Sequence, residues 1–249
     1  MCLIAYTPTV SSRLTYTEIT KAFASNGDGA GLMFSDGKTL TIDKGLFTVD
    51  EFCEAYYSIP DSYPVVSHFR WATHGKKNSD NCHPFALCEG RVGMVHNGIL
   101  PSPESGESDT KFWADTVFWG RRPGFLMSHA FRDHVEKVIG YNKIVLMDSA
   151  GKVSILNANQ GVQKGDRWLS NSCLTDVMTR VYGSCLGLKQ DGWAYEDDDR
   201  PLFSNDTYDA LKDDEAEELS EQFLQDYLER RSAQEQCLRD VKREAGKNV

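Results

Sequence analysis

The sequence predicts an α+β fold, a four-layer αββα sandwich in which two β-sheets lie between outer helices, followed by a C-terminal helical extension. Strand-like and helix-like segments alternate through most of the chain, turn residues between some of them indicate hairpins, and the composition changes near residue 188. A chain of 249 residues suits one large domain with an appendage.

The expected strands are short segments rich in apolar and β-branched residues. They comprise residues 3–6, 30–34, 40–43, 64–69, 91–95, 143–147, 152–156 and 167–169. The first of these would hold residue 2 at the end of a sheet. Ser35-Asp36-Gly37 and Asp148-Ser149-Ala150-Gly151 each stand between two consecutive strands, and their composition indicates hairpin turns.

The expected helices have apolar residues three and four positions apart. In the helix predicted over residues 49–57, Phe52, Ala55 and Tyr56 fall on one face. Further helices are expected over residues 111–119, 125–138 and 173–182. Asn171 offers an N-cap for the last of them.

The end of the chain differs from the rest. Residues 2–188 are expected to form the main domain, 189–208 an acidic linker and 209–249 a charged helical tail. The tail has apolar residues at largely helical spacing, with acids dominating its start and bases its end, as a helix dipole favours. We expect it to pack against the main domain or against a second copy of the chain, with docking of a specific partner as the alternative.

Charge and hydropathy bound the classes of partner. Almost all of the net charge of −10 lies in residues 196–249, and the remainder of the chain is close to neutral. This distribution argues against general nucleic-acid binding. No apolar run approaches the length of a membrane helix, and no basic-then-apolar leader precedes Cys2, so we expect no membrane association.

The seven cysteines are odd in number and scattered, with no C-x-x-C pair. This usage fits reduced thiols and a cytoplasmic protein. Zinc-type ligands do occur in the middle of the chain, but their spacings match no common zinc site. They are His74, Cys82, His83, Cys88 and His96. We expect neither a metal nor a cofactor.

Cys2 stands directly after the initiator methionine. If Met1 is removed, Cys2 carries a free α-amine whose reference pKa, roughly 7.7–8.0, lies below the value of about 8.5 for a free thiol. The amine can then accept the thiol proton near neutral pH and activate the sulfur without a histidine. The alternatives are a residue with no role after Met1, or a buried strand cysteine.

Four polar motifs follow Cys2 in a fixed order. They are Arg70-Trp71-Ala72-Thr73-His74-Gly75, Asn81-Cys82-His83-Pro84, His96-Asn97-Gly98 and Ser108-Asp109-Thr110. Together with the Met-Cys start, this set resembles the class II glutamine amidotransferases, which are N-terminal-nucleophile hydrolases. The variants His83-Pro84-Phe85 and Gly27-Asp28-Gly29-Ala30-Gly31 resemble the small stand-alone branch. The resemblance covers roughly residues 2–180 and implies the αββα sandwich.

Amide hydrolysis through a thiolate creates a negative oxygen that needs preorganised donors. Asn97 offers a side-chain NH₂, and Gly98 offers a backbone N–H with no Cβ in the way. Taken alone, Asn97-Gly98 after an apolar strand favours a hairpin turn. The resemblance instead places an oxyanion hole there.

Glutamine also carries an α-carboxylate and an α-ammonium. Arg70 can clamp a carboxylate with its planar fork, and the resemblance gives it that role; it assigns Asp109 to the ammonium. The alternatives are a surface arginine and an aspartate that caps the helix beginning near Lys111. Lys111 also departs from the family, in which an acidic residue often stands at this position.

The remaining candidates have weaker assignments. The resemblance places Thr73 and His74 at the carboxylate end of the substrate and makes Trp71 part of a lid. His83 is a supporting candidate, and for His96 a core histidine is the favoured interpretation.

These observations predict a glutamine amidotransferase in which Cys2 attacks glutamine, a glutamyl thioester forms, ammonia leaves and water releases glutamate. After the hydrolase about sixty residues remain, too few for a synthase or ligase domain, so we expect a separate ammonia-using subunit. A homo-oligomer through the C-terminal helix is the other expected assembly. The alternatives are an N-terminal-nucleophile amidase acting on another amide of γ-glutamyl type, and a catalytically degenerate binding or assembly protein.

Overall fold

The computed structural model describes residues 2–72, 76–102 and 108–175. Met1, Thr73, His74, the acidic linker, the charged tail and most of the helix predicted over residues 173–182 lie outside the described residues. Within the described ranges, no helix is both long enough and apolar enough to cross a membrane.

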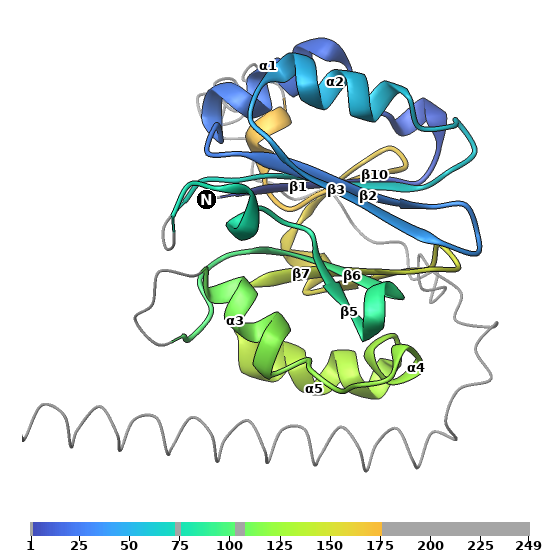
Figure 1. The fold of residues 1–249 in the computed structure, drawn as a ribbon, viewed down its shortest axis with the longest axis vertical. Coiled ribbons are helices and arrows are strands. Elements are labelled where there is room, and N and C mark those ends of the chain that lie inside the picture. The colour runs from blue at the N-terminus through green and yellow to red at the C-terminus, as the bar shows by residue number, and fades with distance from the viewer. Residues whose placement is uncertain (1, 73–75, 103–107, 176–249) are drawn as a thin grey trace, which may run out of the picture.

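Two antiparallel sheets form the centre of the molecule (Figure 1). The larger sheet has the strand order β3-β2-β4-β1-β10-β9 and the smaller one β5-β6-β7-β8. The strands of the larger sheet are β1 (Leu3–Thr7), β2 (Ala30–Ser35), β3 (Leu40–Leu46), β4 (Val65–Phe69), β9 (Val162–Lys164) and β10 (Arg167–Leu169). Those of the smaller sheet are β5 (Phe85–Leu87), β6 (Val92–Asn97), β7 (Lys143–Asp148) and β8 (Val153–Leu156).

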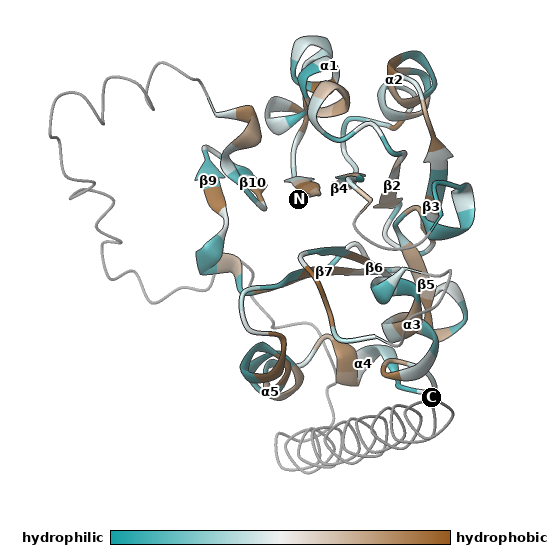
Figure 2. Cartoon of the chain, turned by 90° about the vertical axis from the view of Figure 1, so that its left-hand side faces the viewer, coloured by the Kyte–Doolittle hydropathy of each residue, from teal (hydrophilic) through white to brown (hydrophobic). Residues whose placement is uncertain are grey.

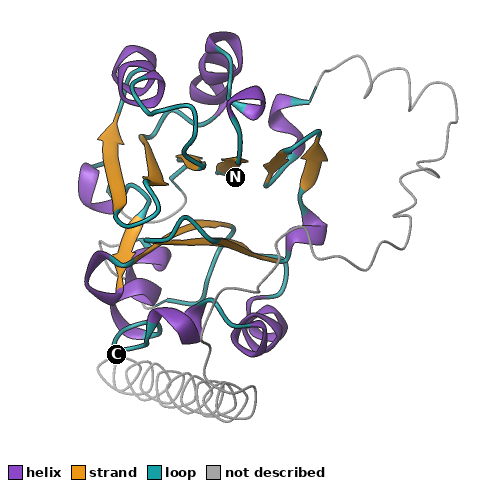
Figure 3. Ribbon diagram, turned by 90° about the vertical axis from the view of Figure 1, so that its right-hand side faces the viewer, coloured by secondary structure: helices purple, strands orange, loops and turns teal. Residues whose placement is uncertain are grey.

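Helices cover the outer face of each sheet, which completes four layers (Figure 3). Over the larger sheet lie α1 (Tyr16–Ser25) and α2 (Val49–Tyr57). Over the smaller sheet lie α3 (Asp109–Thr116), α4 (Pro123–Leu126) and α5 (His129–Ile139). The predicted α+β sandwich with helices outside two sheets is therefore confirmed.

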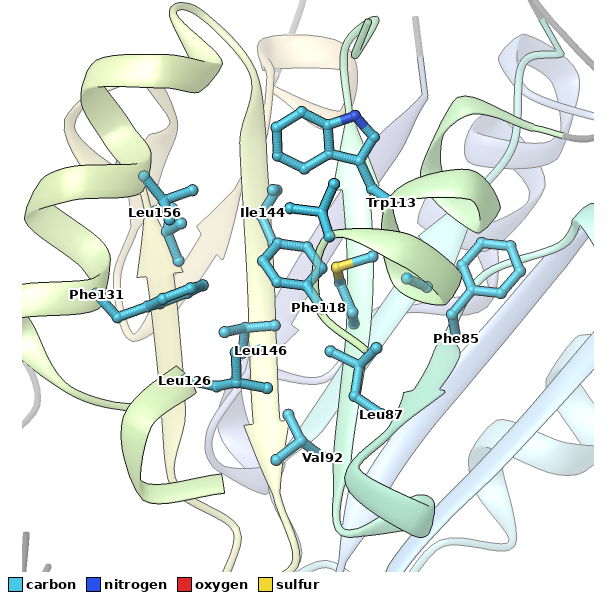
Figure 4. Packing of buried hydrophobic residues seen from close by; sticks show 14 of the residues in the cluster. Phe85, Leu87, Val92, Trp113, Phe118, Leu126, Phe131, Ile144, Leu146 and Leu156 are labelled. Atoms are coloured by element: carbon cyan, nitrogen blue, oxygen red, sulfur yellow. The ribbon is translucent and has the colours of Figure 1, made fainter. Parts of the chain in front are cut away.

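Within the described residues, three apolar clusters lie between the layers. Figure 2 colours the strands and helices that contribute to them by hydropathy. The middle cluster joins the facing sides of the two sheets and includes Ile4, Val66, Val95 and Val145. A second lies between the larger sheet and helices α1 and α2. The third joins the smaller sheet to α3, α4 and α5, where Phe118 and Phe131 are in ring contact with centroids 5.7 Å apart (Figure 4).

Some elements differ from their predictions. The helix predicted over residues 125–138 is two helices, because the Ser128 side chain accepts the Phe131 N–H and starts α5 anew. Strands β5 and β9 and helix α1 were not predicted. Helix α1 does carry a sequence signal, because Thr15 and Glu18 form a capping box at its start. Helix α2 and strand β10 have the predicted bounds.

Candidate active site

Cys2 precedes β1, in the interior of the larger sheet. The backbone N–H of Trp71 donates to Cys2 Sγ at 3.4 Å, and the thiol donates to the Trp71 carbonyl at 3.6 Å. The Asn171 side chain donates to the Cys2 carbonyl at 2.8 Å, so the residue is held from two sides. Burial raises the pKa of the Cys2 thiol, against the opposing effects of the Trp71 hydrogen bond and of Arg70. A thiol in this environment needs a base to become a nucleophile.

Strand register places Arg70 beside Cys2. β1 and β4 are antiparallel with Leu3 opposite Phe69, so the residues just outside this pair, Cys2 and Arg70, are neighbours. Arg70 is only 3% exposed, and its Nη1 donates to the Lys76 carbonyl at 3.0 Å. The predicted alternative of a surface arginine is wrong.

Asp28 fixes the backbone that follows Arg70. Its Oδ2 accepts the Ala72 N–H at 2.8 Å, and its Oδ1 is paired with Lys77. Although burial acts to raise the pKa of Asp28, the bonds from Lys77 and Ala72 hold it below its ordinary value. Trp71, between these anchored residues, is 51% exposed.

The end of β6 brings Gly98 to the same region. Gly98 has φ of +147°, and a Cβ there would lie 1.9 Å from Asn142 Oδ1. Only glycine fits this position, because both the conformation and the space exclude a side chain. The hairpin reading of Asn97-Gly98 is wrong, because β6 pairs with β5 and β7 and the next described element after it is α3.

The Asn97 side-chain amide bonds Ser170. Its Nδ2 donates to Ser170 Oγ at 2.8 Å, and that oxygen also accepts the Ile4 N–H at 2.8 Å. Asn97 Oδ1 is buried with no hydrogen-bond partner among the described residues. Asn97 is absent from the cavity lining, and one of its two amide hydrogens is already engaged.

Asp109 is the first residue of α3, and the N-cap is Ser108, whose side chain accepts the Lys111 N–H at 3.1 Å. The interpretation of Asp109 as the capping residue is therefore wrong. Its Oδ2 accepts the Leu100 N–H at 2.7 Å and its Oδ1 the Thr110 N–H at 2.8 Å. These bonds hold a buried carboxylate at the helix N-terminus, where the dipole favours negative charge.

His96 is buried, as expected for a core histidine, and both ring nitrogens are bonded. Asn142 donates its Nδ2 to the Ile139 carbonyl at 2.6 Å, which turns its Oδ1 toward His96 Nε2 at 2.8 Å. Nε2 therefore carries the hydrogen, and Nδ1 lies 2.8 Å from Thr110 Oγ1, whose hydroxyl is also 3.3 Å from Asp109 Oδ1. Burial lowers the pKa of His96, against the opposing effect of the Asp109 charge.

Two further histidines continue this cluster toward the larger sheet. His68 Nε2 donates to the His96 carbonyl at 3.1 Å, and His83 Nδ1 accepts the His96 N–H at 3.2 Å. The rings of His68 and His83 stack with centroids 4.0 Å apart. Burial lowers the pKa of His68 to about 3 and that of His83 well below its ordinary value. Neither histidine is therefore a proton carrier near neutral pH.

These residues surround one cavity. Its lining consists of Cys2, Arg70, Trp71, Ala72, His83, His96, Gly98, Ser108, Asp109 and Thr110. The free space within this described lining is about 20 Å³, enough for one water molecule. Sequence reasoning found most of this set but gave no role to Thr110, Asn142 or Ser170.

No protein-family model matches the chain. A glutamine–fructose-6-phosphate aminotransferase (isomerizing) of Staphylococcus epidermidis is 28% identical over 172 residues, which cover 62% of this chain and 27% of the relative. The Thermococcus kodakarensis protein of the same name is 38% identical over 74 residues, 29% of this chain and 12% of the relative. The chain thus spans about a quarter or less of these curated relatives.

A solved glutamine phosphoribosylpyrophosphate amidotransferase from B. subtilis, complexed with ADP and GMP, aligns with a TM-score of 0.46 and 19% identity over 71% of this chain and 43% of that one. The sequence relatives confirm the resemblance to class II glutamine amidotransferases.

Proposed function

We propose that this chain is a class II glutamine amidotransferase domain that hydrolyses the side-chain amide of glutamine to glutamate and ammonia through a Cys2 thioester. The observation that carries the proposal is that Cys2, Arg70, Gly98 and Asp109 line one cavity although they come from four separate segments. A nucleophile, an anion clamp, a backbone donor and a cation partner are the groups that this reaction needs.

The first half-reaction begins once Met1 has been removed. The α-amine of Cys2 takes the thiol proton, and the sulfur attacks the side-chain carbonyl carbon of glutamine. The tetrahedral intermediate collapses when the amine returns the proton to the departing nitrogen. Ammonia leaves and a glutamyl thioester remains. Because burial raises the pKa of the thiol, the α-amine is needed to remove its proton.

The second half-reaction consumes water. The same amine removes a proton from a water molecule, the resulting hydroxide attacks the thioester carbonyl, and the thiolate leaves and is reprotonated. Gly98 offers its backbone N–H to the oxyanion in both halves. The second hydrogen of the Asn97 amide can join it, because Ser170 uses only one.

Arg70 and Asp109 set the preference for glutamine in this proposal. Both are buried and carry opposite charges on the same cavity, so an α-carboxylate and an α-ammonium fit between them. Because both side chains are buried, each ion pair with the substrate contributes to binding: a charge left unpaired in such a site is destabilising. The same proposal places Thr73 and His74 at the carboxylate end of the substrate, Trp71 in a lid over it, and His83 in support of the site.

The fate of ammonia is a further part of the proposal. The chain corresponds to a small share of its curated relatives, whose names describe transfer to fructose 6-phosphate. We place the acceptor reaction on a separate subunit, and we assign residues 189–208 to a linker and 209–249 to a helix for assembly with that subunit or a second copy. A cytoplasmic location completes the proposal, consistent with the scattered cysteines.

Glutamate release by purified protein tests the proposal, with the absence of Met1 verified by intact mass. Cys2→Ala should abolish release without changing the unfolding free energy by more than about 1 kcal/mol. Cys53→Ala, which removes a partly buried thiol on α2, is the matched control and should retain activity. Normal release by folded Cys2→Ala would refute the nucleophile. Turnover of a γ-glutamyl amide but not of glutamine would favour the amidase alternative.

A further inference from the structure

Asn142 lies behind the candidate active site, in the turn between α5 and β7. It is partly buried, and it is not among the residues that line the cavity. Its side chain nevertheless bonds His96 and fills the space beside Gly98, and both of these residues do line the cavity. The reaction proposed above gives Asn142 no role.

The hydrogen bonds of the Asn142 amide fix its orientation. Its Nδ2 donates to the carbonyl of Ile139, the last residue of α5, at 2.6 Å. The opposite orientation would place two oxygen atoms against each other, so Oδ1 is the atom that faces His96 Nε2 at 2.8 Å. An amide oxygen only accepts hydrogen bonds, and this position therefore selects a hydrogen on Nε2.

The turn that carries Asn142 is clamped by Asn157, which follows β8. The Asn157 side chain donates to the carbonyls of Gly140 and of Asn142 itself, each at 2.7 Å. The Asn157 N–H donates to Glu136 Oε1 at 2.7 Å, which ties the clamp to α5. Asn157 is buried and has a left-handed conformation with φ of 57°, which asparagine adopts more readily than most residues. These bonds hold the Asn142 backbone in one place.

On one side, Asn142 supports the proposed oxyanion donor. A Cβ at position 98 would lie 1.9 Å from Asn142 Oδ1, 2.7 Å from Asn142 Cγ and 3.1 Å from His96 Nε2. The amide and the ring together fill the space beside the Gly98 Cα. A smaller side chain at position 142 would leave the Gly98 backbone room to turn, and a donor to an oxyanion is effective because it is already in place.

On the other side, Asn142 acts on Asp109 through His96 and Thr110. In a neutral ring, a hydrogen on His96 Nε2 leaves Nδ1 as an acceptor. The single hydrogen of the Thr110 hydroxyl has two acceptors within reach, His96 Nδ1 at 2.8 Å and Asp109 Oδ1 at 3.3 Å. With Nδ1 unprotonated, the shorter contact takes this hydrogen. A hydrogen on Nδ1 would instead turn the hydroxyl toward Asp109, where it would compete with a substrate cation.

We propose that Asn142 is a positioning residue for both ends of the glutamine site. It holds His96 as the Nε2–H tautomer, which leaves Asp109 open to the substrate ammonium. It also supports the Gly98 backbone, whose N–H faces the oxyanion. The effects on glutamine rest on the proposed function, whereas the tautomer of His96 is a property of the protein without substrate.

Nitrogen NMR of the histidine rings tests the tautomer at pH 8, above the ordinary histidine pKa of about 6.5. The His96 signals are assigned by their loss in a His96→Gln protein. In the wild type, Nε2 should be protonated and Nδ1 unprotonated. Asn142→Leu, which removes the acceptor and keeps a side chain of similar shape against Gly98, should show a fraction with Nδ1 protonated.

Ser128→Ala is the control for lost stability, because it removes the N-cap of α5 and leaves the Asn142 side chain intact. It should keep the wild-type signals of His96. A wild-type ring protonated on Nδ1, or an unchanged tautomer in the Asn142→Leu protein, would overturn the assignment of the tautomer to Asn142.

Kinetics with two substrates test the consequences for the reaction. Glutamine is compared with glutaramate, which is glutamine without its α-amino group. Asn142→Leu should lower kcat/KM for glutamine about three- to tenfold and leave that for glutaramate within about twofold, because only glutamine needs Asp109. Asn142→Ala also removes the wall beside Gly98, so kcat should fall about tenfold on both substrates. Ser128→Ala should retain wild-type kinetics on both.

The outcomes separate the parts of the proposal. Equal losses on the two substrates in Asn142→Leu would overturn the link to Asp109, and a wild-type kcat in Asn142→Ala would overturn the support of Gly98. If the wild type turns over neither substrate, the proposed function fails, and the nitrogen spectra still decide whether Asn142 sets the tautomer of His96.

Discussion

The two sheets contribute to the candidate active site in different ways. The larger sheet supplies Cys2 and Arg70 from adjacent strand ends, and the Cys2 sulfur is held only by the backbone of Trp71 among the described residues. The smaller sheet supplies Gly98 and, through α3, Asp109. That side is fixed by linked side-chain bonds from Asn142 to His96 to Thr110.

The larger sheet therefore carries the nucleophile that attacks the substrate, and the smaller sheet carries the donor that stabilises the negative charge on the intermediate. These are the attacking side and the stabilising side of the site. A nucleophile must move toward the substrate and leave again, so backbone contacts with its sulfur are enough. Donors that face a developing charge contribute most when they are already in place, because no reorganisation is then needed during the reaction.

The attacking side depends on a single amine. If Met1 stays attached, this amine becomes an amide and cannot act as a base, so activity should fall by about 10²–10⁴-fold, the usual contribution of general-base catalysis. Specific activity should follow the Met1-free fraction measured by intact mass across several preparations. Full activity in chains that retain Met1 would show that the thiol is activated by another group.

On the stabilising side, the most sensitive position should be Gly98. Gly98→Ala places a Cβ against Asn142 at a φ of +147°, which displaces the backbone N–H, and kcat should fall by about 10²–10³-fold. Gly37→Ala is the matched control: its φ is also positive, at +89°, but no heavy atom lies within 4 Å of the new Cβ. It should lose stability and keep kcat. A normal kcat in Gly98→Ala would remove Gly98 from the oxyanion site.

On the attacking side, Arg70 should determine the preference for glutamine over amides that lack an α-carboxylate. Arg70→Ala should lower kcat/KM for glutamine roughly 30- to 1,000-fold, because a desolvated charge pair is lost. This loss corresponds to about 2–4 kcal/mol of transition-state stabilisation. For an amide that lacks the α-carboxylate the same change should have little effect. Arg91→Ala, an exposed arginine near the far end of β6, is the control. Equal losses on both substrates would make Arg70 structural.

The smallest effect concerns the histidine that joins the two sides. The pKa of His68 is about 3 in the folded protein, against an ordinary value of 6.5. Between these pH values the unfolded chain binds a proton that the folded chain does not. The unfolding free energy should therefore fall as the pH drops below 6.5, by about 1.4 kcal/mol per pH unit.

His68→Gln tests this coupling, because glutamine keeps an N–H donor for the His96 carbonyl and removes the titrating ring. Between pH 7 and pH 5 the wild type should lose about 2 kcal/mol more unfolding free energy than the variant in urea titrations. His134→Gln, on the outer helix α5, should behave as the wild type. Parallel pH profiles for His68→Gln and the wild type would contradict the expected role of His68.

Local pattern predicted much of the fold and less of the site. Helix α2 has the predicted bounds, because its apolar spacing and its capping residues Thr48 and Glu51 lie within or directly beside the segment. Strand β10 also has the predicted bounds, although it has only three residues. Strands β5 and β9 have only three residues each, too few to show a period. The hairpin that Asn97-Gly98 favours when taken alone does not form, because β6 pairs with β5 and β7 and a Cβ at position 98 would meet Asn142.

The site network could not be predicted from local pattern. Asn142 is 46 positions from His96, and Ser170 is 73 positions from Asn97, so nothing in either neighbourhood indicates the bond. Strand register, in contrast, gives the Cys2–Arg70 neighbourhood as soon as β1 and β4 are paired. The resemblance identified the residues of the site, and the fold explains why they lie close together.

The most direct test of the account is a single turnover of glutamine by Met1-free protein, quenched with acid over a time course and examined by mass spectrometry of the N-terminal peptide. We expect a glutamyl group on Cys2 that appears before free glutamate and then declines, and neither species with Cys2→Ala. Glutamate formation with the glutamyl group on another residue, or at the same rate in Cys2→Ala, would contradict the assignment of Cys2 as the nucleophile.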